Sequence, residues 1–375
     1  MKILFTGGGS GGHFYPIIAI AQKVNELVQK EKILDAKLYF MSDSPYNKAA
    51  LYENEMVFVF ASAGKMRRYF SVLNLIDILK TAIGVVKAFW SMYLIYPDVV
   101  VGKGGYASFP ALMAAKLLKI PVVIHESDSF PGRTNLWAGK FAERIAVSYE
   151  EAGKHFPMSK VAFTGQPVRK EILIPLQSGA YEYLKLRQDI PTILILGGSF
   201  GAKLINETVV DILPELLEKY QIIHQVGGEN LKETEALASV VLANSEHKER
   251  YRMFGYLNSL ALRMAAGTAS IIISRGGSTL FEIAAWGLPS IIIPITDSNG
   301  DHQRKNAFNY GRSGAAVIVE EVNLSPHLLL SEINGIMENE ERKEKMSKEA
   351  KAFYKEDAAE KIAKEVLKIA LRHEK

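Results

Sequence analysis

A single histidine stands in a glycine-rich turn near the start of the chain. Residues 6–13 read Thr-Gly-Gly-Gly-Ser-Gly-Gly-His, after an apolar run, Lys2–Phe5, and before an apolar-periodic run, Pro16–Val28. This order predicts a strand, a tight turn and the N-terminus of a helix. Glycines let a ligand approach the backbone, and a helix N-terminus attracts anions. The turn therefore favours binding of a phosphate or a developing anion, with the imidazole of His13 available for proton transfer.

Three further glycine turns follow predicted strands. They are Gly102–Pro110, Gly197–Ala202 and the turn after Ser274, which runs to Glu282. In the first of these turns Lys103 suits an anion. In the last, Ser278 or Thr279 is available to cap a helix, and Glu282 either supports the helix dipole or accepts ribose hydroxyls.

Polar clusters lie at the ends of other predicted strands. His125–Asp128 is followed closely by Arg133 and Asn135, and favours a sugar-binding or acid–base edge. Arg169 either reaches a diphosphate or is a surface arginine. The stretch Asp301–Ala307 carries amide and imidazole groups that could read sugar hydroxyls.

The first turn also fits the dinucleotide fingerprint G-x-G-x-x-G through Gly7, Gly9 and Gly12. That fingerprint expects an acidic residue about 20 positions further on, at the end of the second strand. Asp43 is placed later than this, and a dehydrogenase would not need the second glycine loop of the second half. A dehydrogenase is therefore the weaker alternative.

The amino-acid composition excludes several classes of protein and of metal site. The 375 residues are 48% hydrophobic, carry a formal charge of +4 and include no cysteine. We expect two or three domains, no disulfide and no thiolate zinc site, and the sequence has no His-Glu-x-x-His motif either. The mild charge permits attraction to anionic lipid and does not call for nucleic acid. With no signal peptide visible and no uncharged apolar run of about 18 residues, we expect a protein that is soluble or lies on a membrane surface.

Short apolar runs alternate with helical patterns in both halves, which predicts an α/β fold with parallel sheets covered on both faces. The pattern loosens around Pro167–Ile190, so we place the domain boundary there and expect domains 1–165 and 166–354. The predicted strands are Lys2–Phe5, Lys37–Met41, Val57–Ala61, Asp98–Val101, Val122–His125, Ile145–Ser148, Val161–Thr164, Thr192–Leu196, Ile222–Val226, Ile271–Ser274, Ser290–Ile293 and Ala316–Val319.

One predicted helix, Val72–Tyr93, is apolar on two stripes. Either it is buried on two sides, or it forms an interfacial surface that contacts anionic lipid. The basic residues available for the second interpretation are Arg67, Arg68, Lys80 and Lys87.

Taken together, the motifs resemble the MurG family of N-acetylglucosaminyltransferases, which make lipid II at the inner face of the bacterial membrane. The resemblance covers nearly the whole chain. It implies a GT-B fold, two Rossmann-like doubly wound domains facing a cleft, with the last helix, about 355–375, returning to the first domain. The residues that carry it are Gly8–His13, Gly104–Tyr106 with Pro110, Ile124–Glu126, Pro167–Arg169, Gly197–Ala202, Glu282 and Gln303–Ala307.

The resemblance implies a role for each matching residue. His13 is similar to the histidine proposed as the general base, and Glu126 is a further catalytic candidate. Substrate-binding roles fall on Ser10, Gly11, Gly12, Asp128, Arg169, Ser199, Leu257, Ser278, Thr279, Leu280, Phe281, Glu282 and Gln303, and acceptor-side roles on Gly104, Gly105 and Tyr106.

The sequence departs from the family at a few of these positions. Ser10 stands where threonine is usual, and Asp128 and Gln166 stand where asparagine is usual. Asp128 puts a negative charge near the expected donor sugar. The loop Arg275–Glu282 is one residue shorter than is common.

The resemblance implies inverting, metal-independent transfer of N-acetylglucosamine from UDP-GlcNAc to lipid I, without a cofactor. The donor would lie on domain 166–354, and the acceptor and membrane on domain 1–165. The protein would sit on the cytoplasmic side of the cell membrane through a surface near residues 65–93, with other cell-wall synthesis proteins as possible partners. The alternatives are a related enzyme acting on another lipid, a UDP-sugar 2-epimerase and a non-catalytic UDP-sugar-binding protein.

Overall fold

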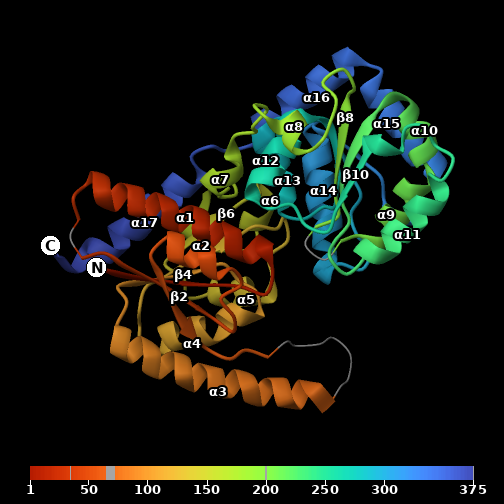
Figure 1. The fold of residues 1–375 in the computed structure, drawn as a ribbon. Helices are drawn as coiled ribbons and strands as arrows, with labels where there is room; N and C mark the ends of the chain where they lie inside the picture. Colours follow the sequence, from red (N-terminus) through yellow and green to blue (C-terminus); the bar gives the residue numbers. More distant parts are fainter. Residues whose placement is uncertain (34, 65–71, 199–200, 375) are drawn as a thin grey trace. The chain divides into compact units, whose positions relative to one another are not determined.

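The chain folds into two compact α/β units, each built on one parallel sheet. The computed structural model describes residues 1–374 except 34, 65–71 and 199–200 (Figure 1). Unit 1 comprises Met1–Arg169 and Lys355–Lys375, and unit 2 comprises Lys170–Tyr354. The predicted α/β class with two parallel sheets is confirmed, and the chain leaves unit 1 after Arg169.

Unit 1 has a seven-stranded sheet in the order β3-β2-β1-β4-β5-β6-β7. Leu4 of β1 pairs with Tyr39 on one side and Val100 on the other. Because the order reverses between β1 and β4, the loops after these two strands flank the point where open α/β sheets bind ligands. The strands are β1 (Lys2–Thr6), β2 (Lys37–Ser42), β3 (Met56–Phe60), β4 (Val99–Gly102), β5 (Val122–Glu126), β6 (Arg144–Val147) and β7 (Val161–Phe163).

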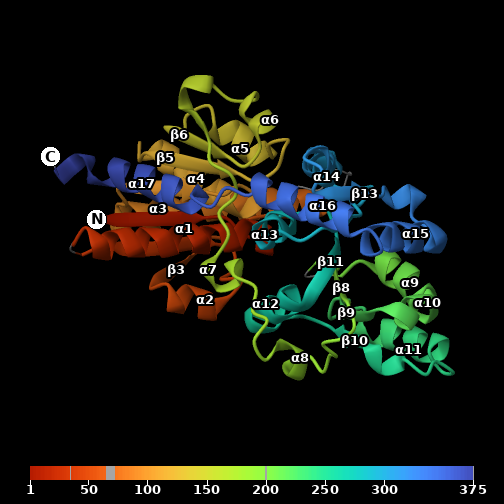
Figure 2. The ribbon, with the colours of Figure 1, turned by 90° about the horizontal axis from the view of Figure 1, so that it is seen from above.

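Two helices far apart in sequence close the core of unit 1. α1 (Gly11–Lys30) and α17 (Ala358–Ala370) lie side by side in both ribbon views (Figures 1 and 2). Ile362 and Val366 of α17 are buried in the same apolar cluster as Ile17 of α1. The remaining helices of this unit are α2 (Lys48–Glu53), α3 (Val72–Ile95), α4 (Phe109–Leu117), α5 (Arg133–Ala138) and α6 (Glu150–Gly153).

α3 packs against α4 (Figure 1) and also bonds the segment after β3. Its buried residues, Asp77, Gly84, Ala88 and Met92, form one narrow stripe, and a side chain at Gly84 would overlap the carbonyl oxygen of Ser62. Of the two alternatives left open by the sequence, burial on two sides is therefore excluded for Leu75–Ile95. Large apolar side chains cover its outer side: Leu75, Ile76, Ile78, Leu79, Ile83, Val86, Trp90, Tyr93 and Leu94.

By length and composition alone, Leu75–Ile95 could cross a membrane, although core helices of soluble proteins can pass the same test. This helix is not a core helix, since only 17% of its most apolar window is buried. The basic run Lys65–Arg68, with Arg67, lies outside the described residues.

Unit 2 has a six-stranded sheet in the order β10-β9-β8-β11-β12-β13, and its order reverses between β8 and β11. The edge strand β10 was not predicted from the sequence. The strands are β8 (Thr192–Leu196), β9 (Gln221–Gln225), β10 (Tyr251–Phe254), β11 (Ala269–Ser274), β12 (Ser290–Ile292) and β13 (Ala316–Ile318).

Helices cover both faces of this sheet. Residues 203–219 form two helices instead of one, because Pro214 lacks the backbone N–H that a continuing helix needs. The helices are α7 (Lys170–Leu173), α8 (Ala180–Tyr183), α9 (Lys203–Asp211), α10 (Leu213–Lys219), α11 (Leu231–Val241), α12 (Ser259–Thr268), α13 (Thr279–Trp286), α14 (His302–Arg312), α15 (Pro326–Met337) and α16 (Glu340–Phe353).

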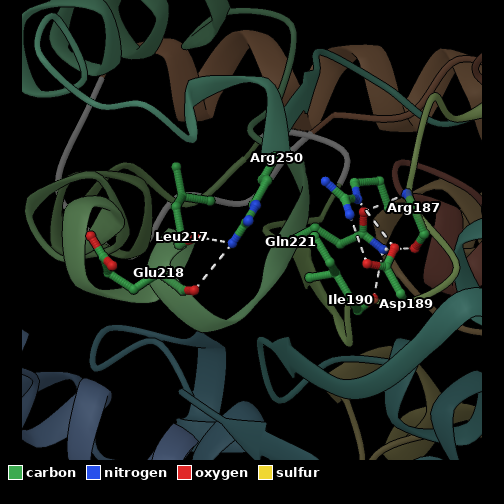
Figure 3. A network of polar contacts seen from close by, with 7 residues as sticks. All are labelled: Arg187, Asp189, Ile190, Leu217, Glu218, Gln221 and Arg250. Atoms are coloured by element: carbon green, nitrogen blue, oxygen red, sulfur yellow. Dashed lines mark hydrogen bonds and ion pairs between the residues drawn. The ribbon is translucent and has the colours of Figure 1, made fainter.

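A buried glutamine fastens the N-terminal end of β9 (Figure 3). Gln221 is 1% exposed, and its amide nitrogen donates to the carbonyl oxygens of Arg187 and Ile190, each at 2.7 Å. Its carbonyl oxygen accepts from the backbone N–H of Arg187 at 2.9 Å. These bonds satisfy a polar group that would be costly to bury unpaired, and they rigidify the sheet at the N-terminal end of β9.

Candidate active site

The glycine turn after β1 holds the ring of His13 in one orientation. His13 lies in the first turn of α1, and its Nδ1 is 2.8 Å from the hydroxyl oxygen of Ser10. Ser10 is the N-cap residue, and its carbonyl oxygen accepts from the backbone N–H groups of His13 and Phe14. This contact orients the imidazole through its Nδ1.

The loop after β4 lies against the same histidine. A side chain at Gly105 would come within 3.6 Å of His13 Nε2, and one at Gly9 within 2.9 Å of the Tyr106 ring. Both glycines have positive φ, +78° and +83°. The two turns therefore meet closely, as expected of loops that flank the switch point of the sheet.

Tyr106 is held by a residue from a third loop. Its hydroxyl hydrogen-bonds Asp43, which follows β2. Burial, this hydrogen bond and the negative charges of Asp43 and Asp77 raise the pKa of Tyr106 to about 12. Asp43 thus supports the loop after β4, a role that sequence reasoning missed when it considered this residue only as a ribose ligand.

Glu126, at the end of β5, organises the loop that follows it. One carboxylate oxygen accepts from the backbone N–H of Asp128 at 2.9 Å. The other accepts from the N–H of Gly132 at 3.0 Å and from the side-chain amide of Asn135 at 2.9 Å. Asn135 also lies under Gly104, where an added side chain would approach its amide nitrogen to 2.8 Å.

A buried lysine lies beside this carboxylate. Lys103 is 2% exposed, and its ammonium donates to the hydroxyl of Ser127 at 2.6 Å. Burial lowers the pKa of Lys103 to about 8, although Glu126 and Asp128 act to raise it. Burial and the charge of Asp128 raise the pKa of Glu126, while Lys103 and the hydrogen bonds oppose that rise.

His125 faces away from this loop, toward the end of unit 1. Its Nε2 lies 3.2 Å from both the carbonyl oxygen of Gly165 and the hydroxyl of Ser148, which donates to Gln166 at 2.8 Å. Burial and the charge of Lys103 hold the pKa of His125 well below its usual range. His125 is therefore a neutral structural residue that anchors the chain just before Arg169.

Arg169, the last residue of unit 1 before the chain enters unit 2, is 9% exposed. Its guanidinium carbon lies 3.7 Å from the centre of the Tyr15 ring. This stacking orients a planar cation that suits a phosphate or diphosphate.

In unit 2 the turn after β11 contacts the start of α14. A side chain at Gly276 would overlap the carbonyl oxygen of Gln303, and Asn306 donates to the carbonyl oxygen of Gly276 at 3.3 Å. The side-chain oxygen of Gln303 accepts from the backbone N–H of Ile295 at 3.2 Å. Gln303 and the turn that carries Ser278 are therefore fixed beside each other.

α13 begins directly after this turn, with Glu282 in its first turn as predicted. Ser278 occupies the N-cap position, but its side chain makes no capping hydrogen bond. Leu280 and Phe281 are buried, and their N–H groups already donate to the carbonyl oxygens of Gly277 and Ser278. Ser278, Thr279 and Glu282 carry the polar side chains at this helix start.

Gln225, which sequence reasoning missed, joins two other loops at this edge. Its amide nitrogen donates to the carbonyl oxygen of Gly198 at 3.2 Å, and its oxygen accepts from the backbone N–H of Leu257 at 2.9 Å. Leu257 is buried. Ser199 lies outside the described residues.

The structure thus gathers the predicted residues into one set per unit. In unit 1 the set is Ser10, Gly11, Gly12, His13, Gly104, Gly105, Tyr106, Glu126 and Asp128, at the C-terminal edge of the sheet, with Arg169 at the unit's end. In unit 2 it is Leu257, Ser278, Thr279, Glu282 and Gln303. Among the described residues, no group of three or more histidine, aspartate or glutamate side chains could hold a metal ion.

Known proteins match this chain along nearly its whole length. The N-terminal domain model of glycosyltransferase family 28 matches residues 3–147, and the C-terminal domain model of that family matches residues 192–362. A UDP-N-acetylglucosamine--N-acetylmuramyl-(pentapeptide) pyrophosphoryl-undecaprenol N-acetylglucosamine transferase from Bacillus thuringiensis (strain Al Hakam) is 36% identical, covering 91% of this chain and 92% of its own length. The transferase of that name from Natranaerobius thermophilus is 35% identical, covering 97% of this chain and 98% of its own.

Solved structures agree on the fold. Acinetobacter baumannii MurG superposes with a TM-score of 0.72 at 24% identity, over 98% of this chain and 99% of that one. A putative UDP-N-acetylglucosamine 2-epimerase from Listeria monocytogenes also reaches 0.72, at 14% identity, over 100% of this chain and 96% of that one. These likenesses define a two-unit protein of the GT-B type and do not by themselves separate transferase from epimerase.

The sequence relatives make that separation. At 35–36% identity over more than nine-tenths of the chain, they are all transferases of one kind. The chain belongs to the MurG family, within glycosyltransferase family 28.

Proposed function

We propose that this protein transfers N-acetylglucosamine from UDP-GlcNAc to lipid I and so makes lipid II for peptidoglycan synthesis. The observation that carries the proposal is the near full-length identity to transferases named for this reaction. The oriented histidine in the first glycine turn adds support, because an epimerase or a binding protein needs no base for an incoming acceptor.

In the proposed reaction an acceptor hydroxyl attacks the anomeric carbon of the donor sugar. The new carbon–oxygen bond forms as the bond to the UDP oxygen breaks, which inverts the configuration, and His13 takes the hydroxyl proton. We assign the accepting role to Nε2, which requires Nδ1 to carry the ring proton and to donate it to the hydroxyl oxygen of Ser10. The serine hydroxyl can accept this bond, so the contact orients the ring and is compatible with that tautomer.

The departing diphosphate carries negative charge that the protein must stabilise. In unit 1 we assign this role to Arg169, which Tyr15 orients. In unit 2 we assign it to the start of α13, where the helix dipole favours negative charge. We assign the ribose to Glu282, the donor sugar to Gln303 and the uracil to the loop at Leu257, with Ser199 as a further diphosphate contact. Gly104, Gly105 and Tyr106 face the acceptor.

α3 provides the proposed membrane surface. Its outer side is apolar and exposed, while Lys80 and Lys87, one heptad apart, lie at the margin of that side. Lys87 also lies over the exposed ring of Phe60 at 5.4 Å. Because α3 is bound along its length to α4 and to the segment after β3, we propose that it lies flat in the interface of an anionic membrane instead of spanning it.

The test is sugar transfer from several radiolabelled UDP-sugars to a lipid I analogue and, in parallel, to diacylglycerol. We expect labelled lipid II from UDP-GlcNAc and no labelled diacylglycerol. Release of an epimerised sugar without an acceptor would replace the proposal with an epimerase. UDP binding without any transfer would replace it with a binding protein.

A further inference from the structure

A glutamate that follows β13 holds two other loops of unit 2. One carboxylate oxygen of Glu321 lies 2.6 Å from Nη2 of Arg275, which comes directly after β11. The other oxygen accepts from the backbone N–H of Thr296, in the loop after β12, at 2.9 Å. Because β11, β12 and β13 are neighbours in the sheet, this one carboxylate joins the three loops at its C-terminal edge.

The ion pair is sheltered from water, and both of its charges also bond the backbone. The side chains of Arg275 and Glu321 are 14% and 15% exposed. Nη1 of Arg275 donates to the carbonyl oxygen of Ile293 at 3.2 Å. A fully exposed ion pair is screened by solvent and orders little, whereas charge-assisted hydrogen bonds in a sheltered place fix a geometry. The segment 293–296 is therefore held at both ends, by Arg275 at Ile293 and by Glu321 at Thr296.

This segment in turn orients the side chain of Gln303. Ile295 lies between the two held ends, and its backbone N–H donates to Oε1 of Gln303 at 3.2 Å. A backbone N–H can only donate, so the bond fixes the amide with its oxygen toward Ile295 and its NH2 group on another side. The backbone of Gln303 is packed separately, against the turn at Gly276. Glu321 is thus linked to the side-chain amide of Gln303 through the segment 293–296.

We propose that Glu321 is a positioning residue for recognition of the donor sugar, which acts by holding the segment that orients the amide of Gln303. The inference rests on the proposed function, which assigns the donor sugar to Gln303. It adds that the sugar must present an oxygen as hydrogen-bond acceptor to the NH2 group of this amide. Because UDP lacks the sugar, the binding of UDP alone does not depend on Glu321.

The experiment measures the affinities for UDP-GlcNAc and for UDP by calorimetry in Glu321→Gln, Gln303→Ala and the double variant. In Glu321→Gln the charge opposite Arg275 is lost, and an NH2 group meets one of two donors, the guanidinium or the N–H of Thr296. We expect binding of UDP-GlcNAc to weaken about tenfold, the worth of one good hydrogen bond, and binding of UDP to stay the same. The double variant should bind UDP-GlcNAc as Gln303→Ala does, because Glu321 acts through Gln303.

Two results would overturn the inference. One is an equal weakening of UDP and UDP-GlcNAc in Glu321→Gln, which would mean a general effect on unit 2. The other is multiplication of the two single losses in the double variant, which would mean that Glu321 does not act through Gln303. The matched control is Glu338→Gln, which removes an ion pair with Lys219 whose side chains are more than half exposed. It should leave both affinities unchanged, and a tenfold loss there would also refute the specific role of Glu321.

A second measurement needs no variant. Thr296 is exposed, so its backbone N–H should exchange with solvent about tenfold or more slowly than in an unstructured chain only if Glu321 holds it. Exchange at the unstructured rate would refute the inference even if Glu321→Gln failed to fold. Failure of the proposed function would instead appear as an unmodified protein that transfers no sugar to lipid I.

Discussion

The outer side of α3 gives the sharpest prediction about where this protein works. Replacing Leu79, Ile83, Val86 and Trp90 by glutamine removes apolar surface without removing a good helix former. These side chains are 58%, 54%, 57% and 59% exposed, so roughly half of each is free to enter lipid. Full burial of such a side chain is worth about 1.5–3 kcal/mol, so the exposed half is worth about 1 kcal/mol and the four together about 4 kcal/mol.

An energy of that size corresponds to about a 1,000-fold loss of membrane partitioning, since 1.4 kcal/mol is a factor of ten. The assay is cosedimentation with vesicles of phosphatidylethanolamine and phosphatidylglycerol. The free energy of unfolding should differ from that of the unmodified protein by no more than about 0.5 kcal/mol per exposed substitution. This measurement separates an effect on membrane binding from an effect on folding.

The matched control replaces two exposed apolar residues of α11, Leu237 and Val240, by glutamine. They lie in unit 2, outside the proposed surface, so vesicle binding should not change. Cosedimentation of the quadruple variant at the level of the unmodified protein would refute the assignment of α3 to the membrane. An equal loss in the α11 variant would show that exposed apolar area in general, and not α3, drives binding.

Four further predictions test unit 1. Ser10→Ala should lower kcat about five- to tenfold, because the hydrogen bond to His13 is lost. Ser10→Thr keeps the hydroxyl and should keep the kcat of the unmodified protein. An unchanged kcat in Ser10→Ala would show that the serine does not have this role. Gly105→Ala should lower kcat, because a methyl group at φ +78° strains the turn beside Nε2 of His13. The affinity for UDP, measured by calorimetry, should stay the same. A normal kcat would show that the turn adapts to the methyl group. Val366→Ala, at a fully buried site, should reduce the free energy of unfolding by about 2 kcal/mol, as measured by urea denaturation. No reduction would mean that α17 is dispensable for the core. Because the pKa of Lys103 is about 8 when folded and about 10.5 when unfolded, the unfolded chain binds more protons between these values. The stability of the unmodified protein relative to Lys103→Met should therefore rise with pH across that window, by up to about 1.4 kcal/mol per unit, and a flat difference would contradict the burial of a charged lysine.

The sheets were predictable because a strand buried on both faces is a short, continuous apolar run. β8, with Thr192–Leu196 entirely buried, has the bounds that the sequence predicted. β10 was missed because Tyr-Arg-Met-Phe lies at the edge of the sheet and is only half buried, so its apolar signal is weak. The glycine turns could be located for the same local reason, since each follows such an apolar run directly.

What could not be predicted depends on partners distant in sequence. The bond from Tyr106 to Asp43 and the link that Gln225 makes between Gly198 and Leu257 join residues more than 25 positions apart. The donors to Glu126 from Asp128 and Gly132 are backbone groups, which carry no residue-type signal. The exposure of α3 likewise depends on which stripe meets α4, and two apolar stripes leave that choice open.

The docking of α17 beside α1 has a consequence for biosynthesis. Unit 2 is one continuous stretch, Lys170–Tyr354, and all of it is synthesised, and leaves the ribosome, ahead of Ile362 and Val366. The larger part of unit 1, although translated first, keeps the apolar face of α1 uncovered throughout that interval. The domain translated second is therefore the first that can complete its fold, and the nascent amino-terminal half is the natural client for a chaperone.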